Sequence, residues 1–267
     1  MQDIRIAAAV FNSIVNQPQN NLERMVPLIK QARHQGASLI CFPELNVTGY
    51  STRTSIEASA EPVPGPISRR LQQMAHEFRI VILAGMAEKD KRGRIYASHL
   101  VVTPQDISGI YRKVHIAPPE LGVFAAGNAV PLFETGGVKL GIQLCYDVHF
   151  PELATRMALK GADIIFIPHA SPRGTPSDKL NSWLRHLTAR AFDNGVFIVA
   201  CNQNGDNQTG LQFPGVVVVI DPSGEIIKKD IKGKDGIVVA ELRAETLEAV
   251  RGHRMRYFLP NRRPDLY

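Results

Sequence analysis

Three residues with different chemistry each follow an apolar, strand-like run of the sequence. Glu44 ends the run SLICFPE, Lys113 ends ISGIYRK, and Cys145 ends VKLGIQLC. Loops at the carboxyl ends of strands are where α/β folds place their functional residues. A thiol can act as a nucleophile, a carboxylate can accept its proton, and an ammonium can stabilise developing negative charge. The three side chains together therefore form a complete set for nucleophilic catalysis.

The sequence motifs of several other enzyme classes are absent. The chain contains no GxSxG, no glycine-rich phosphate loop, no HExxH and no paired CxxC, which are signatures of serine hydrolases, nucleotide sites and metal sites. None of the eight histidines lies at short metal-ligand spacing from a second ligand. We therefore expect neither a metal ion nor a cofactor.

The elements that must position these residues alternate between apolar strands and amphipathic helices. In the first helix, Asn20 is expected to cap the N-terminus, Glu23 to complete a capping box, and Gly36 to end the helix. Strands are predicted at 4–10, 38–42, 80–87, 95–102, 107–113, 138–145, 163–168, 196–202, 216–220, 225–229 and 236–242, and further helices at 67–78, from Pro151, and at 179–194.

The mixture of strand–helix units and hairpins predicts an α/β layered fold with mixed sheets. The turn-prone segments TPQD and DPSG connect the two predicted hairpins. No Ser/Gly-rich linker divides the chain. We therefore expect one domain over residues 1–250, followed by a C-terminal tail at 251–267.

Composition limits the class of protein. The chain has 267 residues, of which 44% are hydrophobic and 21% charged, enough to bury a large core without disulfides. Its three cysteines, an odd number, cannot all pair in disulfides. Because they lie in apolar runs, we expect reduced thiols in a cytoplasmic protein. No apolar stretch approaches a membrane span, and the N-terminus does not resemble a signal peptide. We expect no membrane partner.

The positive charge of the chain is concentrated in the tail. The formal net charge is +6, and residues 251–267 contain five arginines and one aspartate, a net +4. A nucleic-acid interface usually needs a broader basic surface with interleaved aromatic residues. We therefore expect no nucleic-acid partner, and we interpret the tail as a segment that docks on a partner subunit.

Three motifs resemble the signatures of the nitrilase superfamily, the carbon–nitrogen hydrolases. They are CFPELNVTGY around Glu44, YRKVHIAPPE around Lys113 and GIQLCYDVHFPE around Cys145. The segment 183–205 and the closing RRPDLY are also similar to that superfamily, so the resemblance extends from Ile4 to Tyr267. It implies a four-layer αββα sandwich that assembles into a homodimer or a higher homo-oligomer.

The same resemblance implies a role for each motif residue. Cys145 would be the nucleophile, with a pKa lowered by a nearby lysine, and Glu44 the general base. Lys113 and the backbone N–H of Tyr146 would stabilise the oxyanion. Glu120 would orient the lysine and the attacking water.

Other residues receive weaker interpretations. His149, His169 and Arg173 are candidates for contacts with the substrate, and Arg173 could bind a carboxylate. Supporting roles are expected for His115 in its loop and Asp147 at its turn. Trp183 is expected in the core or at an interface, and Cys41 and Cys201, which lie in apolar runs, are expected in the core.

The residues after the nucleophile bear on the reaction. True nitrilases usually read CWE at this point, whereas this chain reads CYD, as in the amidase and carbamoylase branches. We therefore expect hydrolysis of a small amide or N-carbamoyl compound through a cysteine thioester. Two alternatives remain open: a nitrilase acting on a small nitrile, and a non-catalytic homologue that works as an interaction module.

Overall fold

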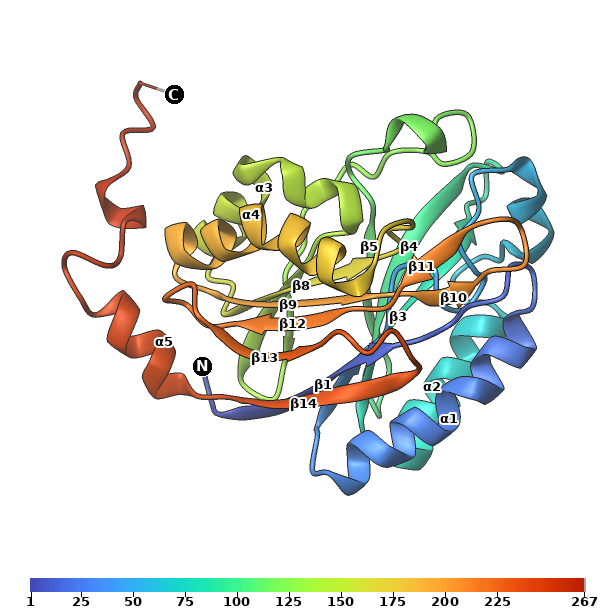
Figure 1. Cartoon of the computed structure of the whole chain (residues 1–267), viewed down its shortest axis with the longest axis horizontal. Coiled ribbons are helices and arrows are strands. Elements are labelled where there is room, and N and C mark those ends of the chain that lie inside the picture. Colours follow the sequence, from blue (N-terminus) through green and yellow to red (C-terminus); the bar gives the residue numbers. More distant parts are fainter. Residues whose placement is uncertain (267) are drawn as a thin grey trace.

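The computed structural model describes residues 1–266 and contains two six-stranded sheets packed face to face (Figure 1). Helices α1 (Pro18–His34) and α2 (Pro66–Phe78) cover the outer face of one sheet. Helices α3 (Pro151–Leu159) and α4 (Pro176–Asn194) lie on the outer side of the other. This arrangement confirms the predicted αββα sandwich with mixed sheets.

The first sheet has the strand order β14-β1-β2-β3-β4-β5. The pairs β1–β2 and β2–β3 are parallel, and the pairs toward both edges are antiparallel. Its strands are β14 (Gly236–Leu242), β1 (Ile4–Val10), β2 (Leu39–Cys41), β3 (Val81–Lys89), β4 (Ile95–Val102) and β5 (Ile107–Arg112).

The second sheet has the order β13-β12-β9-β8-β7-β6, and its central strands β7, β8 and β9 are parallel. Two very short strands, β10 (Asn204–Asp206) and β11 (Gln212–Pro214), pair separately. The second sheet consists of β13 (Ile226–Asp230), β12 (Val217–Ile220), β9 (Phe197–Asn202), β8 (Ile164–His169), β7 (Val138–Ile142) and β6 (Phe133–Thr135).

The central strands of the first sheet are covered on both faces, and residues 6–10 of β1, which follow the exposed Arg5, show why such strands are apolar. Ile6 and Ala8 belong to the core between the sheets, whereas Ala7 and Ala9 pack toward α1 and α2. Successive side chains of a strand point to opposite faces. A strand covered on both faces therefore reads as a continuous apolar run. The two sheets also meet at a bridge between Phe11 and Gln203.

Two helices begin earlier than the sequence predicted. Helix α1 starts at Pro18, so Asn20 lies inside the helix and does not cap it; its amide donates to Gln17 Oε1 at 3.2 Å. Proline is favoured at the first helical position because its fixed φ suits the helix and its missing N–H is not needed there. Gly36, with φ +79°, follows the end of the helix as expected.

Helix α4 likewise starts at Pro176 and not at residue 179. Thr175 Oγ1 accepts a hydrogen bond from the Asp178 N–H at 3.1 Å, and the Asp178 carboxylate accepts from the Thr175 N–H at 3.1 Å. This capping box satisfies two backbone donors that a helix start would otherwise leave unpaired.

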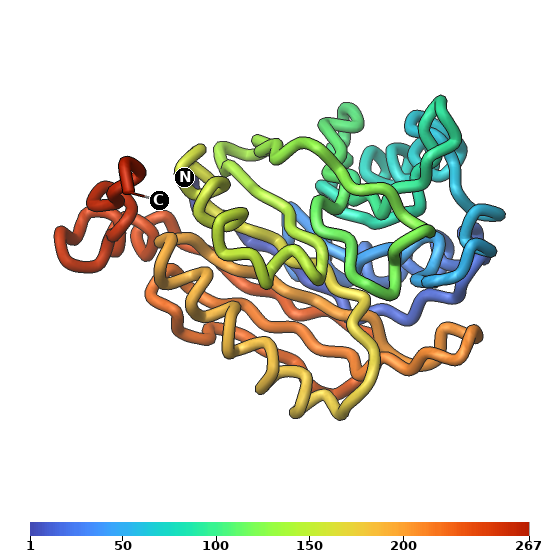
Figure 2. Tube along the Cα trace, turned by 90° about the horizontal axis from the view of Figure 1, so that it is seen from above, coloured from blue at the N-terminus to red at the C-terminus, as the bar shows by residue number. Residues whose placement is uncertain are grey.

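Helix α5 (Ala244–Arg251) is bound to the residues that precede β8 and β9 of the second sheet. Arg251 Nη1 lies 3.0 Å from Asp163 Oδ1, and Arg251 Nε donates to the Gly195 carbonyl at 3.0 Å. Beyond α5 the chain extends to one end of the molecule, beside the sandwich (Figure 2). No helix within residues 1–266 is long and apolar enough to cross a membrane.

Candidate active site

Lys113 lies between two buried carboxylates. Its Nζ is 2.9 Å from Glu44 Oε1 and 2.7 Å from Glu120 Oε1. Glu44 follows β2, Lys113 directly follows β5, and Glu120 ends the short 3-10 helix η2 (Pro118–Glu120). Each of the three side chains is at most 3% exposed. The structure thus brings together three residues that the sequence separates by up to 76 positions.

Cys145 begins the 3-10 helix η3 (Cys145–His149) and adopts φ +40°. A residue other than glycine rarely occupies this left-handed region, and such strain persists only where the surroundings hold the residue in place. Strand β7 ends at Ile142, so the predicted strand 138–145 was too long. Cys145 is partly exposed, unlike Cys41 and Cys201, which are both buried in the core.

Asp147 holds the Cys145 turn against the loop that follows Lys113. Its Oδ2 accepts hydrogen bonds from the Leu144 N–H at 2.9 Å and the Tyr111 hydroxyl at 2.8 Å. Its Oδ1 accepts from the His115 N–H at 2.8 Å and lies 2.8 Å from His115 Nδ1. The fully buried carboxylate caps the turn, as predicted, and His115 supports its loop.

The Ala170 N–H connects Glu44 with Cys145. Ala170 directly follows β8, and its N–H donates to Glu44 Oε2 at 3.1 Å. The Cys145 thiol is near enough to this N–H and to Glu44 for both to shift its pKa, the N–H lowering it and Glu44 raising it. The base candidate and the nucleophile candidate are therefore neighbours around one backbone donor. The Gln203 side chain fixes Glu44 from the other side, since its Nε2 donates to the Glu44 carbonyl oxygen at 2.7 Å.

Glu120 has two further partners that fix both of its oxygens. The Tyr50 hydroxyl donates to Oε1 at 3.0 Å, and the Ala117 N–H donates to Oε2 at 3.0 Å. Sequence reasoning did not single out Tyr50. The signal was present, because Tyr50 closes the same CFPELNVTGY motif that contains Glu44.

The pKa values of Glu44 and Lys113 are both raised, for different physical reasons. Desolvation raises the pKa of Glu44 to about 7, with Lys113 opposing the shift and Glu120 adding to it. Burial by itself would lower the pKa of Lys113, but the neighbouring acidic groups, Glu44 first, raise it above its ordinary value. Lys113 is thus a permanent cation, and Glu44 can exchange a proton near neutral pH.

The thiol of Cys145 differs from the sequence expectation. Desolvation and the charge of Glu44 raise its pKa to about 12, and Lys113 only partly offsets them. The predicted lowering by a nearby lysine was therefore outweighed by desolvation, which disfavours the charged form. The resting residue is a thiol, so it requires a base to become a nucleophile.

The three candidates for substrate contacts occupy different surroundings. His169 ends β8, is 2% exposed, and stacks on Trp183 with ring centroids 4.1 Å apart. His149 is exposed in the η3 turn, and its ring lies 5.7 Å from that of Tyr146. Arg173 is exposed on the loop after β8.

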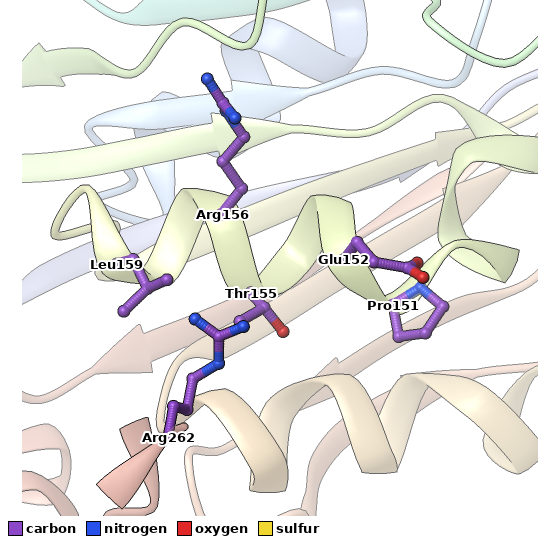
Figure 3. Close-up of a pocket in the computed structure, with 6 residues that line it drawn as sticks. All are labelled: Pro151, Glu152, Thr155, Arg156, Leu159 and Arg262. Atoms are coloured by element: carbon purple, nitrogen blue, oxygen red, sulfur yellow. The ribbon is translucent and has the colours of Figure 1, made fainter. Parts of the chain in front are cut away.

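A hollow on the outer surface of α3 lies apart from these groups (Figure 3). None of Glu44, Lys113, Glu120 and Cys145 lines it. Among the described residues, no group of three His, Cys, Asp or Glu side chains could hold a metal ion. The hollow is lined by Pro151, Glu152, Thr155, Arg156, Leu159 and Arg262.

Comparison with known proteins relates this arrangement to a family. Residues 5–252 match the family model of the carbon–nitrogen hydrolases. A nitrilase of Pyrococcus abyssi is 31% identical over 274 residues, covering 99% of each chain. An omega-amidase of Xenopus tropicalis is 29% identical over 241 residues, covering 86% of each.

Solved structures agree with the sequence relatives. A mutant of an amidase from Nesterenkonia AN1, described as a member of the nitrilase superfamily, has a TM-score of 0.85 and 26% identity, over 98% of this chain and 95% of that one. Another structure of that amidase, with the same scores and coverage, shows the acetamide moiety of fluoroacetamide added covalently at its active-site cysteine. As its motifs predicted, the chain belongs to the carbon–nitrogen hydrolases of the nitrilase superfamily.

Proposed function

We propose that this carbon–nitrogen hydrolase cleaves a small amide or N-carbamoyl compound through a thioester on Cys145. The observation that carries the proposal is the buried Glu44–Lys113–Glu120 cluster, with Cys145 placed beside Glu44 at the Ala170 N–H. A base with a pKa near 7 next to a protonated thiol suits general base catalysis at neutral pH.

In the first step, ionised Glu44 takes the thiol proton as Cys145 Sγ attacks the carbonyl carbon. The new C–S bond moves the carbonyl π electrons onto oxygen. Lys113 Nζ and the Tyr146 N–H would stabilise that oxyanion, because Tyr146 is the second residue of η3 and the first N–H groups of a helical turn have no acceptor within it. Loss of such a donor typically costs about 10²–10³ in rate.

In the second step, protonated Glu44 gives its proton to the leaving nitrogen. The C–N bond breaks, ammonia or an amine departs, and the acyl group remains as a thioester on Cys145. Glu44 then takes a proton from water, whose oxygen attacks the thioester carbon. The C–S bond breaks, the acid product departs, and Glu44 returns the proton to Cys145 Sγ. Glu120 positions Lys113 and the attacking water, since hydrogen bonds hold both of its oxygens. A carbamoyl substrate would also yield carbon dioxide.

The relatives support an amide substrate and also favour a second candidate. The relatives include an omega-amidase of Xenopus tropicalis and a 2-oxoglutaramate amidase of Bacillus subtilis, and the Nesterenkonia enzyme reacts at a cysteine. The nitrilase of Pyrococcus abyssi is 31% identical, against 29% for each of these two amidases, so a nitrile is the alternative substrate. The CYD sequence at residues 145–147 favours the amide.

Ammonia release from a panel of compounds tests the reaction class. We expect wild-type protein to release ammonia from at least one short amide, N-carbamoyl amino acid or ω-amide, and Cys145→Ala to release none, because the thioester cannot form. Turnover of a nitrile alone would favour the alternative. Retained amide turnover in Cys145→Ala would contradict the proposed mechanism.

The pH dependence of Cys145 alkylation tests the role of Glu44. As pH rises through about 7, Glu44 ionises and can accept the thiol proton, so the rate of iodoacetamide labelling should rise with that midpoint. In Glu44→Gln the midpoint should disappear and the rate at pH 8 should fall about 10²-fold. Peptide mass spectrometry measures the rate, with buried Cys41 and Cys201 as internal references.

If the pH dependence of Cys145 alkylation is unchanged in Glu44→Gln, Glu44 is not the base. Labelling of Cys145 no faster than Cys41 or Cys201 would favour the non-catalytic interaction module.

We also propose that the arginine-rich tail docks on a partner subunit of a homo-oligomer. The support is its position beside the sandwich and the anchoring of α5 through Arg251, which leaves the following residues at one end of the molecule (Figure 2). Deleting residues 252–267 keeps the Arg251 contacts and should shift the full-length assembly to a smaller species in light scattering. An unchanged mass would contradict the docking role.

A further inference from the structure

Lys179 brings an ammonium group close to the backbone that holds Glu44. Its Nζ donates to Ser171 Oγ at 2.8 Å and to the Pro172 carbonyl at 2.9 Å. Ser171 directly follows Ala170, whose N–H donates to Glu44 Oε2. The loop is also fixed from β9, because Asn202 pairs with both the N–H and the carbonyl of Ser171. The cation is therefore held at a defined place beside the reaction centre.

This ammonium has no anionic partner in the part of the chain that the structure describes. Its two acceptors are neutral oxygens, and no carboxylate of residues 1–266 forms an ion pair with it. Lys179 is half-buried, and desolvation lowers its pKa whereas the nearby Cys145 raises it. A partly desolvated cation without a counter-ion gains strongly from an arriving anion.

His169 offers a second, independent polar group at the same loop. Although it is 2% exposed, neither of its ring nitrogens has a hydrogen-bond partner. Stacking on Trp183 fixes the orientation of the His169 ring. Lys179 precedes Trp183 by one turn of α4, so both side chains lie on the same face of that helix. Buried polar groups are nearly always hydrogen-bonded, and an exception requires an explanation. A bound molecule would supply the missing partner.

Basic and imidazole side chains of α4 continue toward the Cys145 turn, where Asp193 and Glu152 lie within electrostatic range of Arg190. His186, which lies on the same face of α4 as Trp183, has its ring 4.8 Å from that of His149. Arg190 comes one further turn along α4 and donates from Nε to the Val148 carbonyl at 3.1 Å. This face of α4 therefore presents cations and imidazoles to the loop after β8 and to η3.

We infer that Lys179 and His169 bind a carboxylate on the acyl part of the substrate, so that amides carrying a carboxylate a few bonds from the scissile carbonyl are the preferred class. The inference rests on the proposed amide hydrolysis. Lys179 supplies the charge, and a ring nitrogen of His169 supplies a hydrogen bond to the second oxygen. The exposed Arg173 on the same loop is not required for this recognition.

Matched pairs of substrates test the inference. Succinamate and butyramide have the same carbon chain and differ in the terminal carboxylate. Wild-type kcat/KM should favour succinamate, and Lys179→Met should reduce that preference by about 10- to 100-fold, mainly through KM for succinamate, with a much smaller effect on butyramide. Lys179→Arg, which keeps the charge, should retain most of the preference. Lys228→Met, at an exposed lysine of β13, makes the same charge change as a control.

Two further variants separate recognition from support of the loop. Ser171→Ala removes one partner of Lys179 and keeps its charge, so the preference should persist. His169→Phe keeps the stacking on Trp183 and should weaken succinamate more than butyramide. Equal loss of both substrates in Lys179→Met, or no wild-type preference for succinamate, would overturn the inference.

Binding without turnover distinguishes this inference from the proposed reaction. Calorimetry with succinate and butyrate, which cannot be hydrolysed, should show tighter binding of succinate to wild type and loss of that difference in Lys179→Met. If this binding difference is observed but no ammonia is released, the carboxylate site is supported and the proposed hydrolysis is contradicted. If ammonia is released but succinate and butyrate bind equally well, the proposed hydrolysis is supported and the carboxylate site is contradicted.

Discussion

The arrangement of the site depends on the ammonium of Lys113 held between the carboxylates of Glu44 and Glu120. Each of these charges would be costly in a dry interior, and their proximity offsets that cost only while all three are in place. Removing one partner of such a buried pair typically destabilises a protein by about 3–5 kcal/mol. Because Glu44 and Lys113 follow β2 and β5 and Glu120 ends η2, the sandwich must hold these elements in register for the charges to meet.

The same desolvation also determines the chemistry. It raises the pKa of Glu44 to about 7 and that of Cys145 to about 12, so the resting protein has a protonated thiol beside a base that titrates near neutral pH. A thiolate then forms only as an electrophile is attacked. Asp147 supports this geometry without touching the reacting atoms, since it links the Cys145 turn to the loop after Lys113.

The sequence allowed the layers, most strands and the meeting of Glu44, Lys113 and Glu120 to be predicted. Continuous apolar runs mark strands buried on both faces, and reactive side chains at their ends point to one edge of the sheets. The starts of α1 and α4 were misplaced because prolines at the first helical position, and the Thr175–Asp178 capping box, were not weighed.

The remaining features depend on contacts between distant segments. Tyr50, the Ala170 N–H and Lys179 acquire their importance only when the two sheets and α4 pack together. The pKa of Cys145 was predicted in the wrong direction for the same reason. The sequence predicts a lysine beside the cysteine, whereas only the packed structure shows that desolvation outweighs the effect of this lysine on the pKa of Cys145.

The most direct test of the account is the mass of the protein during turnover. Rapid acid quenching of wild-type protein with a reactive amide, followed by intact mass spectrometry and peptide mapping, should reveal an adduct with the mass of the substrate less ammonia, located on Cys145. Steady turnover without any adduct, or an adduct on another residue, would contradict a mechanism in which Glu44, Lys113 and Glu120 serve a cysteine nucleophile.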